Sequence, residues 1–284
     1  NVRYLEERFS PQQEFSATQL EGYATCPFRF WVSDVLKLRE VEAPDQFTDF
    51  GRRGDIVHDI LRQLHSELKP TPDAIPAAAA IETFRKLLSD RLSQELAGSD
   101  LLAALIRIEQ RFLEEWGHEY ADQWANYHET NRESSGTFIQ PTLFEVTFGT
   151  PHTSATAVES RPYLTLGSAQ SETRIRGRID RIDVGEISGQ PVFNIIDYKT
   201  GRKPSTTAAQ MTSGRSLQLV LYALATQRLN LVGSNSIPIQ AGYWCLRETG
   251  WTPINKAPQV GANGLEPHAD WLALVDVLDE LVPR

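Results

Sequence analysis

Apolar residues recur at three- and four-residue spacings through the first half of the chain, and this period predicts helices there. We expect helices over residues 50–68, 75–96 and 100–127. A proline-rich segment ends the first and Gly98 ends the second. The third carries an apolar stripe, which helical spacing assigns to the core, although its aromatic rings could also stack on bases. The stripe consists of Leu101, Leu105, Ile108, Phe112, Trp116, Tyr120 and Trp124.

Alternating and β-branched segments dominate the second half and predict strands. These strands cover residues 137–148, 163–166, 173–184, 192–199 and 240–246, with helices over 214–229 and 270–281. The chain is therefore expected to have an α/β fold. We expect residues 1–284 to form a single domain, with a helical region over about 16–130 and an α/β core over about 137–284.

Residues 173–199 bring two carboxylates together if they form an antiparallel hairpin. The connecting segment 185–191 holds two glycines, a serine and a proline, which is typical of a turn. With a four-residue loop over 187–190, Asp180 lies opposite Asp197 and both side chains point to one face. Lys199 emerges on that same face, because side chains in a strand alternate. Opposed carboxylates repel unless a cation lies between them, so this register predicts a metal site with a lysine beside it.

The order of the motifs resembles the PD-(D/E)XK nuclease superfamily, and within it the branch of RecB- and AddB-type nuclease domains. In the second half the resemblance is carried by Gly177-x-x-Asp180-x-x-Asp183, Asp197-Tyr198-Lys199-Thr200-Gly201 and Gln218-x-x-x-Tyr222. It implies a restriction-endonuclease-like α/β core with a mixed central sheet flanked by helices, together with an N-terminal α-helical region.

The first half carries two further parts of the resemblance. Residues 15–31 are similar to the opening of AddB-type domains, with Ala17-Thr18 in place of a serine-rich start. Residues 51–58 fit a glycine-to-histidine motif that the family carries on a helix, and His58 is the last residue of the motif. The resemblance covers about Ser16 to Tyr222 with its motifs in the expected order.

The resemblance implies a role for each matching residue. Metal ligands would be His58, Asp180, Asp197 and the backbone carbonyl of Tyr198. Lys199 would orient the attacking water and neutralise charge on the phosphate. Glu145 would lie near the metal or the water, and Gln218 and Tyr222 would reach toward the active site or the substrate backbone. The catalytic set is therefore Glu145, Asp180, Asp197, Lys199, Gln218 and Tyr222.

Each of these residues also has a structural interpretation. An isolated histidine on a helix is more often a core residue, and only the preceding glycines favour a ligand at His58. Glu145 suits a solvent-facing position equally well. Asp180 and Asp197 could be exposed on an amphipathic hairpin, with Lys199 in an ordinary surface ion pair. Likewise, Tyr222 could pack on the sheet while Gln218 points to solvent. Asp183 faces away from Asp180, which favours a structural role.

The expected cofactor is Mg²⁺ or Mn²⁺, since carboxylate oxygens suit both and an imidazole ligand favours manganese. AddB-type domains hold an iron–sulfur cluster with a cysteine at the position of Cys26 and three more near the C-terminus. Four thiolates are required, and this chain has only Cys26 and Cys245, so no iron–sulfur cluster is expected within it. Cys26 is then expected to be a small buried residue.

Composition narrows the remaining choices. Two distant cysteines give no disulfide framework, and no apolar run could span a bilayer, so a cytoplasmic protein without a membrane partner is expected. The formal net charge of −9 is unusual for a protein that grips DNA unaided. The first residue is Asn1 rather than methionine, which is expected for an excised domain or for a processed product.

These observations lead to a functional expectation. The chain resembles a metal-dependent DNase, an exonuclease domain acting with a helicase domain or subunit in DNA end processing and recombinational repair. No phosphate-binding Walker loop occurs in the sequence, which would place an ATP-driven motor elsewhere. Two alternatives remain: a catalytically silent module that binds DNA or a partner, and a stand-alone nuclease of a CRISPR system or mobile element.

Overall fold

The computed structural model describes most of the chain. The described residues are 13–38, 50–71, 76–94, 100–149, 161–168, 171–201, 204, 206–254, 259–261, 264–266, 272, 273, 275, 276 and 278. None of the helices in this part of the chain is both long and apolar enough to span a bilayer.

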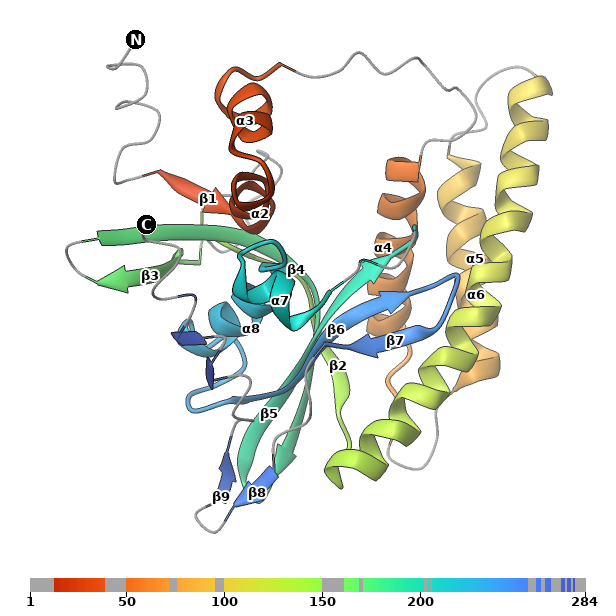
Figure 1. Ribbon diagram of the computed structural model, residues 1–284. Coiled ribbons are helices and arrows are strands. Elements are labelled where there is room, and N and C mark those ends of the chain that lie inside the picture. Colours follow the sequence, from red (N-terminus) through yellow and green to blue (C-terminus); the bar gives the residue numbers. More distant parts are fainter. Residues whose placement is uncertain are drawn as a thin grey trace.

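A mixed sheet is the centre of the fold (Figure 1). Its path is β1-β4-β5-β6-β7, and β2 and β3 also pair with β4. The strands are β1 (Glu14–Ser16), β2 (Gln140–Phe148), β3 (Leu164–Ser168), β4 (Ser171–Ile187), β5 (Gln190–Lys199), β6 (Ile237–Cys245) and β7 (Gly250–Pro253). The pairs β1–β4 and β5–β6 are parallel and the others antiparallel, which confirms the expected mixed α/β sheet. A separate hairpin joins β8 (Gln259–Gly261) to β9 (Gly264–Glu266).

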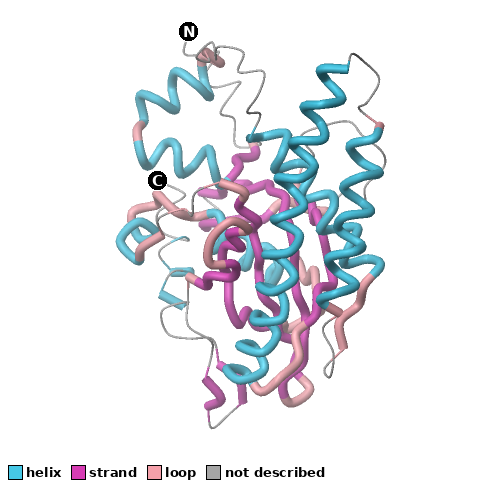
Figure 2. The backbone as a smooth tube through the Cα atoms, turned by 90° about the vertical axis from the view of Figure 1, so that its right-hand side faces the viewer, coloured by secondary structure: helices cyan, strands magenta, loops and turns pink. Residues whose placement is uncertain are grey.

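Helices cover both faces of this sheet. Figure 1 shows α4 (Phe50–Glu67), α5 (Ala77–Ser93) and α6 (Asp100–Ser135) gathered on one side, with α8 (Gln218–Arg228) on the other. In Figure 2, the three long helices lie in front of the sheet. The N-terminal α2 (Ala17–Thr25), α3 (Pro27–Phe30) and a short π-helix, η1 (Trp31–Val35), lie above the sheet in Figure 1. The short α7 (Ala208–Thr212) precedes α8.

Strand β5 is buried on both faces, which explains its continuous apolar sequence. Ile195 packs in the cluster that includes α8, whereas Ile196 packs in the cluster formed by α4, α5 and α6. Side chains alternate along a strand, so Asp197 and Lys199 share the face of Ile195, and Tyr198 faces the three-helix layer. The buried aromatic residues of α6, such as Trp116, Tyr120 and Trp124, belong to that layer, as expected.

The hairpin β4–β5 has the predicted register. Ser188 and Gly189 form its turn with positive φ values of 52° and 80°, the backbone of a two-residue type I′ turn. The ladder runs from Ile187 paired with Gln190 to Arg181 paired with Ile196. One further pair in this register places Asp180 opposite Asp197.

Other predictions differ in detail. Helix α6 continues to Ser135, and β4 is longer than predicted at both ends because it pairs with four neighbouring strands. Ile108 is 65% exposed, so it does not belong to the core stripe. Cys26 is half-buried rather than buried and caps α3, accepting a hydrogen bond from the backbone of Arg29 at 3.4 Å. The predicted helix over 270–281 lies largely outside the described residues.

Candidate metal centre

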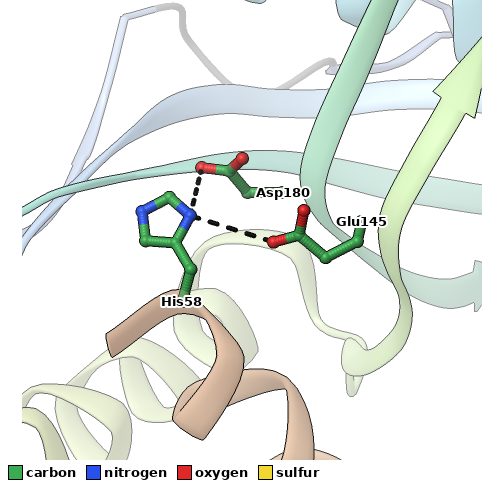
Figure 3. A group of neighbouring side chains, drawn as sticks. All are labelled: His58, Glu145 and Asp180. Carbon is green, nitrogen blue, oxygen red and sulfur yellow. Dashed lines mark ion pairs between the residues drawn. The ribbon is translucent and has the colours of Figure 1, made fainter. Parts of the chain in front are cut away.

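Three elements bring a histidine and two carboxylates together beside the sheet (Figure 3). His58 comes from α4, Glu145 from β2 and Asp180 from β4. The Nδ1 atom of His58 lies 3.6 Å from Asp180 Oδ2 and 3.8 Å from Glu145 Oε1. All three ligand atoms lie within 4.8 Å of one another, close enough to bind one cation.

Glu145 is held in an unusual backbone conformation. Its φ is +50°, in the left-handed region that residues with a Cβ rarely adopt. The neighbouring residues Phe144 and Val146 keep their ladder pairs with β4, so the distortion is local. Strained residues of this kind cluster at functional sites, where the surrounding structure holds them in place. Glu145 therefore does not simply face solvent, because its carboxylate points at His58.

The surroundings of Asp180 disfavour its ionised form. Burial raises the pKa of this carboxyl to about 7, and the charge of Asp197 adds to the effect. His58 and the backbone N–H of Tyr198, which donates to Asp180 Oδ2 at 2.9 Å, act in the opposite direction. A divalent cation would relieve the repulsion that these two aspartates exert on each other.

Asp197, Lys199, Gln218 and Tyr222 form a second group beside Asp180. Lys199 forms an ion pair with Asp197 Oδ2, and Gln218 Nε2 donates to Asp197 Oδ1 at 2.7 Å. Gln218 also donates to the hydroxyl of Tyr222 at 3.3 Å. Burial lowers the pKa of Lys199, but Asp197 outweighs it and leaves the pKa above its usual value. Lys199 therefore remains an ammonium group.

Gly177 allows α8 to approach β4 closely. A Cβ at this position would lie 2.8 Å from ring carbons of both Phe148 and Tyr222. Glycine is thus required for Tyr222 to pack beside the strand that carries Asp180. Its place in the predicted glycine–aspartate motif has this steric cause.

The donor set fits a hard divalent cation. Two carboxylates and one imidazole are available, and both Mg²⁺ and Mn²⁺ accept such oxygen-rich sets. Burial lowers the pKa of His58, but Glu145 and Asp180 outweigh this effect and leave the pKa above its usual value. The two carboxylates therefore favour the protonated, positively charged ring. A cation bound to its Nδ1 lone pair would take the place of that proton.

The predicted residues divide between the two groups. His58, Glu145 and Asp180 lie together in a cluster that could hold a metal ion, and their roles as metal ligands stay predictions. Asp197 lies in the second group, where Lys199 and Gln218 contact it. The backbone N–H of Tyr198 contacts Asp180, and metal binding by its carbonyl stays a prediction.

Glu21 was not predicted to contribute to the site. Its Oε1 atom accepts the backbone N–H groups of Leu217 and Gln218, at 2.6 and 2.9 Å, and so caps α8. The partners are separated by almost 200 residues in the sequence. No local pattern signals such a contact, although Glu21 lies within the N-terminal stretch that resembles AddB-type domains.

Comparison with known proteins agrees with these observations. A model of the PD-(D/E)XK nuclease superfamily matches residues 14–282. Several bacterial proteins that are each named as a subunit of an ATP-dependent helicase/deoxyribonuclease are similar to the chain. That of Carboxydothermus hydrogenoformans is 26% identical over 83% of this chain and 20% of its own length. That of Symbiobacterium thermophilum is 28% identical over 74% and 17%, respectively.

The chain spans about a fifth of the length of these relatives. The similarity to the protein of Caldanaerobacter subterraneus subsp. tengcongensis, 27% identical, likewise covers 18% of that protein. The names of these relatives therefore describe proteins much longer than the segment that matches.

Proposed function

Because the chain belongs to the PD-(D/E)XK nuclease superfamily, we propose that it is a deoxyribonuclease domain that requires Mg²⁺ or Mn²⁺. The observation that carries this proposal is the meeting of His58, Glu145 and Asp180 beside the Asp197–Lys199 pair. A protein surface without a catalytic or binding role would not need two carboxylates, a histidine and an ammonium group in one partly buried cluster.

We assign the metal ligands to His58, Glu145 and Asp180, with Asp197 and the carbonyl of Tyr198 close enough in sequence and register to add to them. A bound divalent cation would supply a more acidic water and would polarise the scissile phosphate. Manganese is the better match to the histidine.

The remaining residues orient the groups of the site and neutralise negative charge on Asp197 and on the phosphate. Lys199 is an ammonium group held by Asp197, from which it can donate to an attacking water or to a phosphate oxygen. Gln218 fixes the other oxygen of Asp197, which leaves that carboxylate one orientation. Tyr222 supports Gln218 through its hydroxyl. These three side chains prepare the site before substrate arrives.

DNA as substrate and a helicase as partner are supported by the names of the similar proteins. We propose that the domain degrades DNA ends as an exonuclease while a helicase domain or subunit supplies the strand. We also propose that the protein is cytoplasmic, which agrees with a role in DNA end processing and recombinational repair.

Cleavage of a labelled DNA oligonucleotide tests the proposal. Wild-type protein should cut with Mn²⁺ or Mg²⁺ and stop when EDTA is added. Asp197→Asn and Asp180→Asn should each lower the rate on the order of 10²–10³-fold, because each removes a charge that the transition state requires.

Glu186→Gln is the matched control, since it neutralises an exposed carboxylate on the same strand as Asp180. It should cut at the wild-type rate. A wild-type protein that binds DNA but cuts nothing with either metal would instead support a catalytically silent binding module.

A further inference from the structure

A fully buried arginine lies directly after Asp180, between the sheet and the three-helix layer. Arg181 is 0% exposed and forms a two-pronged ion pair with Asp183, which is also 0% exposed. The Nε and Nη2 atoms of Arg181 donate to the two carboxylate oxygens of Asp183, each at 2.5 Å. Asp183 therefore faces away from the metal cluster, as expected.

The remaining nitrogen of Arg181 connects three other elements. Nη1 donates to the hydroxyl of Tyr120 at 2.8 Å, to the hydroxyl of Tyr198 at 2.9 Å and to Nε2 of His65 at 3.1 Å. Burial and the charge of Arg181 hold the pKa of His65 well below its usual value, so its ring is neutral and Nε2 accepts. We call Arg181, Asp183, Tyr120, Tyr198 and His65 the Arg181 network.

Further side chains complete the surroundings of the pair. Tyr127 donates to Asp183 Oδ2 at 2.9 Å, and Asn194 in turn donates to the Tyr127 hydroxyl at 2.9 Å. The rings of Tyr127 and Trp244 lie 5.6 and 5.3 Å from the guanidinium carbon of Arg181. The ion pair thus has hydrogen-bond partners from the sheet, from α4 and from α6.

Stability alone does not explain such a pair. Removing two charges from water costs about as much as their attraction returns, and apolar side chains of similar volume often stabilise a core at least as well. Buried polar groups can instead specify one arrangement of elements, because any shift leaves a donor or acceptor without a partner.

The members of the network lie next to the residues of the site. Arg181 follows Asp180 on β4, and Tyr198 lies between Asp197 and Lys199 on β5. His65 lies two helical turns after His58 on α4. Strands β4 and β5 and helix α4 are thus joined at one guanidinium, close to the point where each contributes to the site.

We propose that the Arg181 network is a positioning device that fixes α4, β4 and β5 relative to one another and so prepares the donors of the metal centre. The metal part of this inference rests on the proposed function. The mechanical part does not, because it concerns the distance between strands in the metal-free protein.

The double substitution Arg181→Met with Asp183→Leu tests the proposal. It replaces the ion pair by apolar side chains of similar size, while Tyr120 keeps His65 and Tyr198 as partners and Tyr127 keeps Asn194. The protein should therefore fold, with a thermal unfolding midpoint moderately below that of wild type. Mn²⁺ affinity, measured by calorimetric titration without DNA, should fall about tenfold. In the metal-free protein, hydrogen exchange at the Tyr198 amide, which donates to Asp180, should become faster.

His128→Phe is the control, because His128 is buried in the same helical layer but contributes no hydrogen bond to the Arg181 network. Its Mn²⁺ affinity and its exchange at Tyr198 should match those of wild type. If the double variant does not fold, Tyr198→Phe removes one hydroxyl from the network while keeping the ring, and about threefold weaker Mn²⁺ binding is expected.

Two results would overturn the proposal. One is a folded double variant with wild-type exchange at Tyr198 and wild-type Mn²⁺ affinity; the other, where only the single variant folds, is unchanged behaviour of Tyr198→Phe. A wild-type protein that binds no Mn²⁺ would refute the proposed function, while the exchange measurement would still decide the positioning role.

Discussion

Asp180 shows at the scale of one residue how a proposed metal ligand lowers the stability of a protein that holds no cation. Its carboxyl is 8% exposed and lies near Asp197 and Glu145, so without a cation its ionised form is opposed on several sides. The pKa of about 7, against an ordinary value of 3.8, has burial as its largest cause. Between these two values the folded state holds a proton that the unfolded state has lost.

This difference predicts how stability depends on pH in the metal-free protein. Because the folded state binds more protons between pH 4 and 7, the Asp180 contribution falls as pH rises through that range. Asp180→Asn removes the ionisation and keeps an oxygen to accept the Tyr198 N–H. We expect the variant to be more stable than wild type by roughly 4 kcal/mol at pH 8 and close to it near pH 4.

Chemical unfolding in EDTA at the two pH values measures this effect. Glu186→Gln, an exposed change on the same strand, should alter stability at neither pH. A variant less stable than wild type at pH 8 would mean that the Asp180 carboxylate is already compensated without metal.

Residue-scale predictions from the sequence succeeded where a residue's neighbours are close in the chain. The register that places Asp180 opposite Asp197 follows from turn residues at 185–191 and from the apolar pattern on either side. The inward orientation of Glu145 did not follow, because alternation assumes regular strand geometry and its φ is +50°. Local propensity does not foresee a strained residue that its surroundings hold.

At the scale of an element, helix α8 depends on a distant carboxylate. The N-cap residue Leu217 provides no side-chain cap, and Glu21 of α2 accepts the N–H groups of Leu217 and Gln218 in its place. Burial raises the pKa of Glu21, although these two N–H groups act against the shift. Gln218, the first residue of α8, contacts Asp197, so the cap also locates part of the site.

Glu21→Ala should therefore affect stability and cleavage together. Loss of a helix cap costs about 1 kcal/mol, and a displaced Gln218 should lower the cleavage rate about tenfold with Mn²⁺. Glu21→Gln keeps one acceptor oxygen and should restore most of the rate. Thermal unfolding and oligonucleotide cleavage measure the two effects.

Thr207→Ala supplies the comparison, since Thr207 caps α7 through its own side chain. It should lose similar stability and cut at the wild-type rate. Equal rates in Thr207→Ala and Glu21→Ala would show that the Glu21 cap does not position Gln218.

Elements differ in how well the sequence predicted them. The long helices α4, α5 and α6 were predicted because a sustained apolar period identifies them, whereas α7 has only five residues and no such period. The same limit applies to η1 and to β1. The cap of α8 could not be predicted, because its two partners are brought together only by the tertiary fold.

At the scale of the whole molecule, the negative charge limits how the protein meets DNA. Lys and Arg number 28 against 37 Asp and Glu, which gives −9. Favourable contacts with DNA phosphates must therefore come from basic residues that are grouped on one part of the surface. Strand β4 carries Arg174, Arg176 and Arg178 at alternate positions, which places them on one face and opposite the buried Ile175 and Ile179.

This arginine row leads to the metal centre. Arg178 is 58% exposed and lies 3.0 Å from Glu145, whereas Arg174 pairs with Glu172 at 3.0 Å. Such partly exposed ion pairs contribute little to stability and can be exchanged for phosphate contacts. If DNA is the substrate, we expect the row to contact the backbone of the strand that reaches Asp180.

Two double variants of equal charge test this role. Arg174→Gln with Arg178→Gln removes two cations from the row, and Arg62→Gln with Arg85→Gln removes two from exposed ion pairs on α4 and α5. Each changes the net charge from −9 to −11, since 26 cations then face 37 anions. Affinity for labelled single-stranded DNA is measured in EDTA as salt is varied.

Only the row variant should bind more weakly. The slope of log K against log salt should become shallower by about 1.4, as expected for two lost phosphate contacts on a single strand. The helix variant should keep the wild-type slope, because its two arginines lie away from the row. Equal weakening in both variants would mean that net charge governs binding, and the arginine row would then have no special part in guiding DNA to the metal centre.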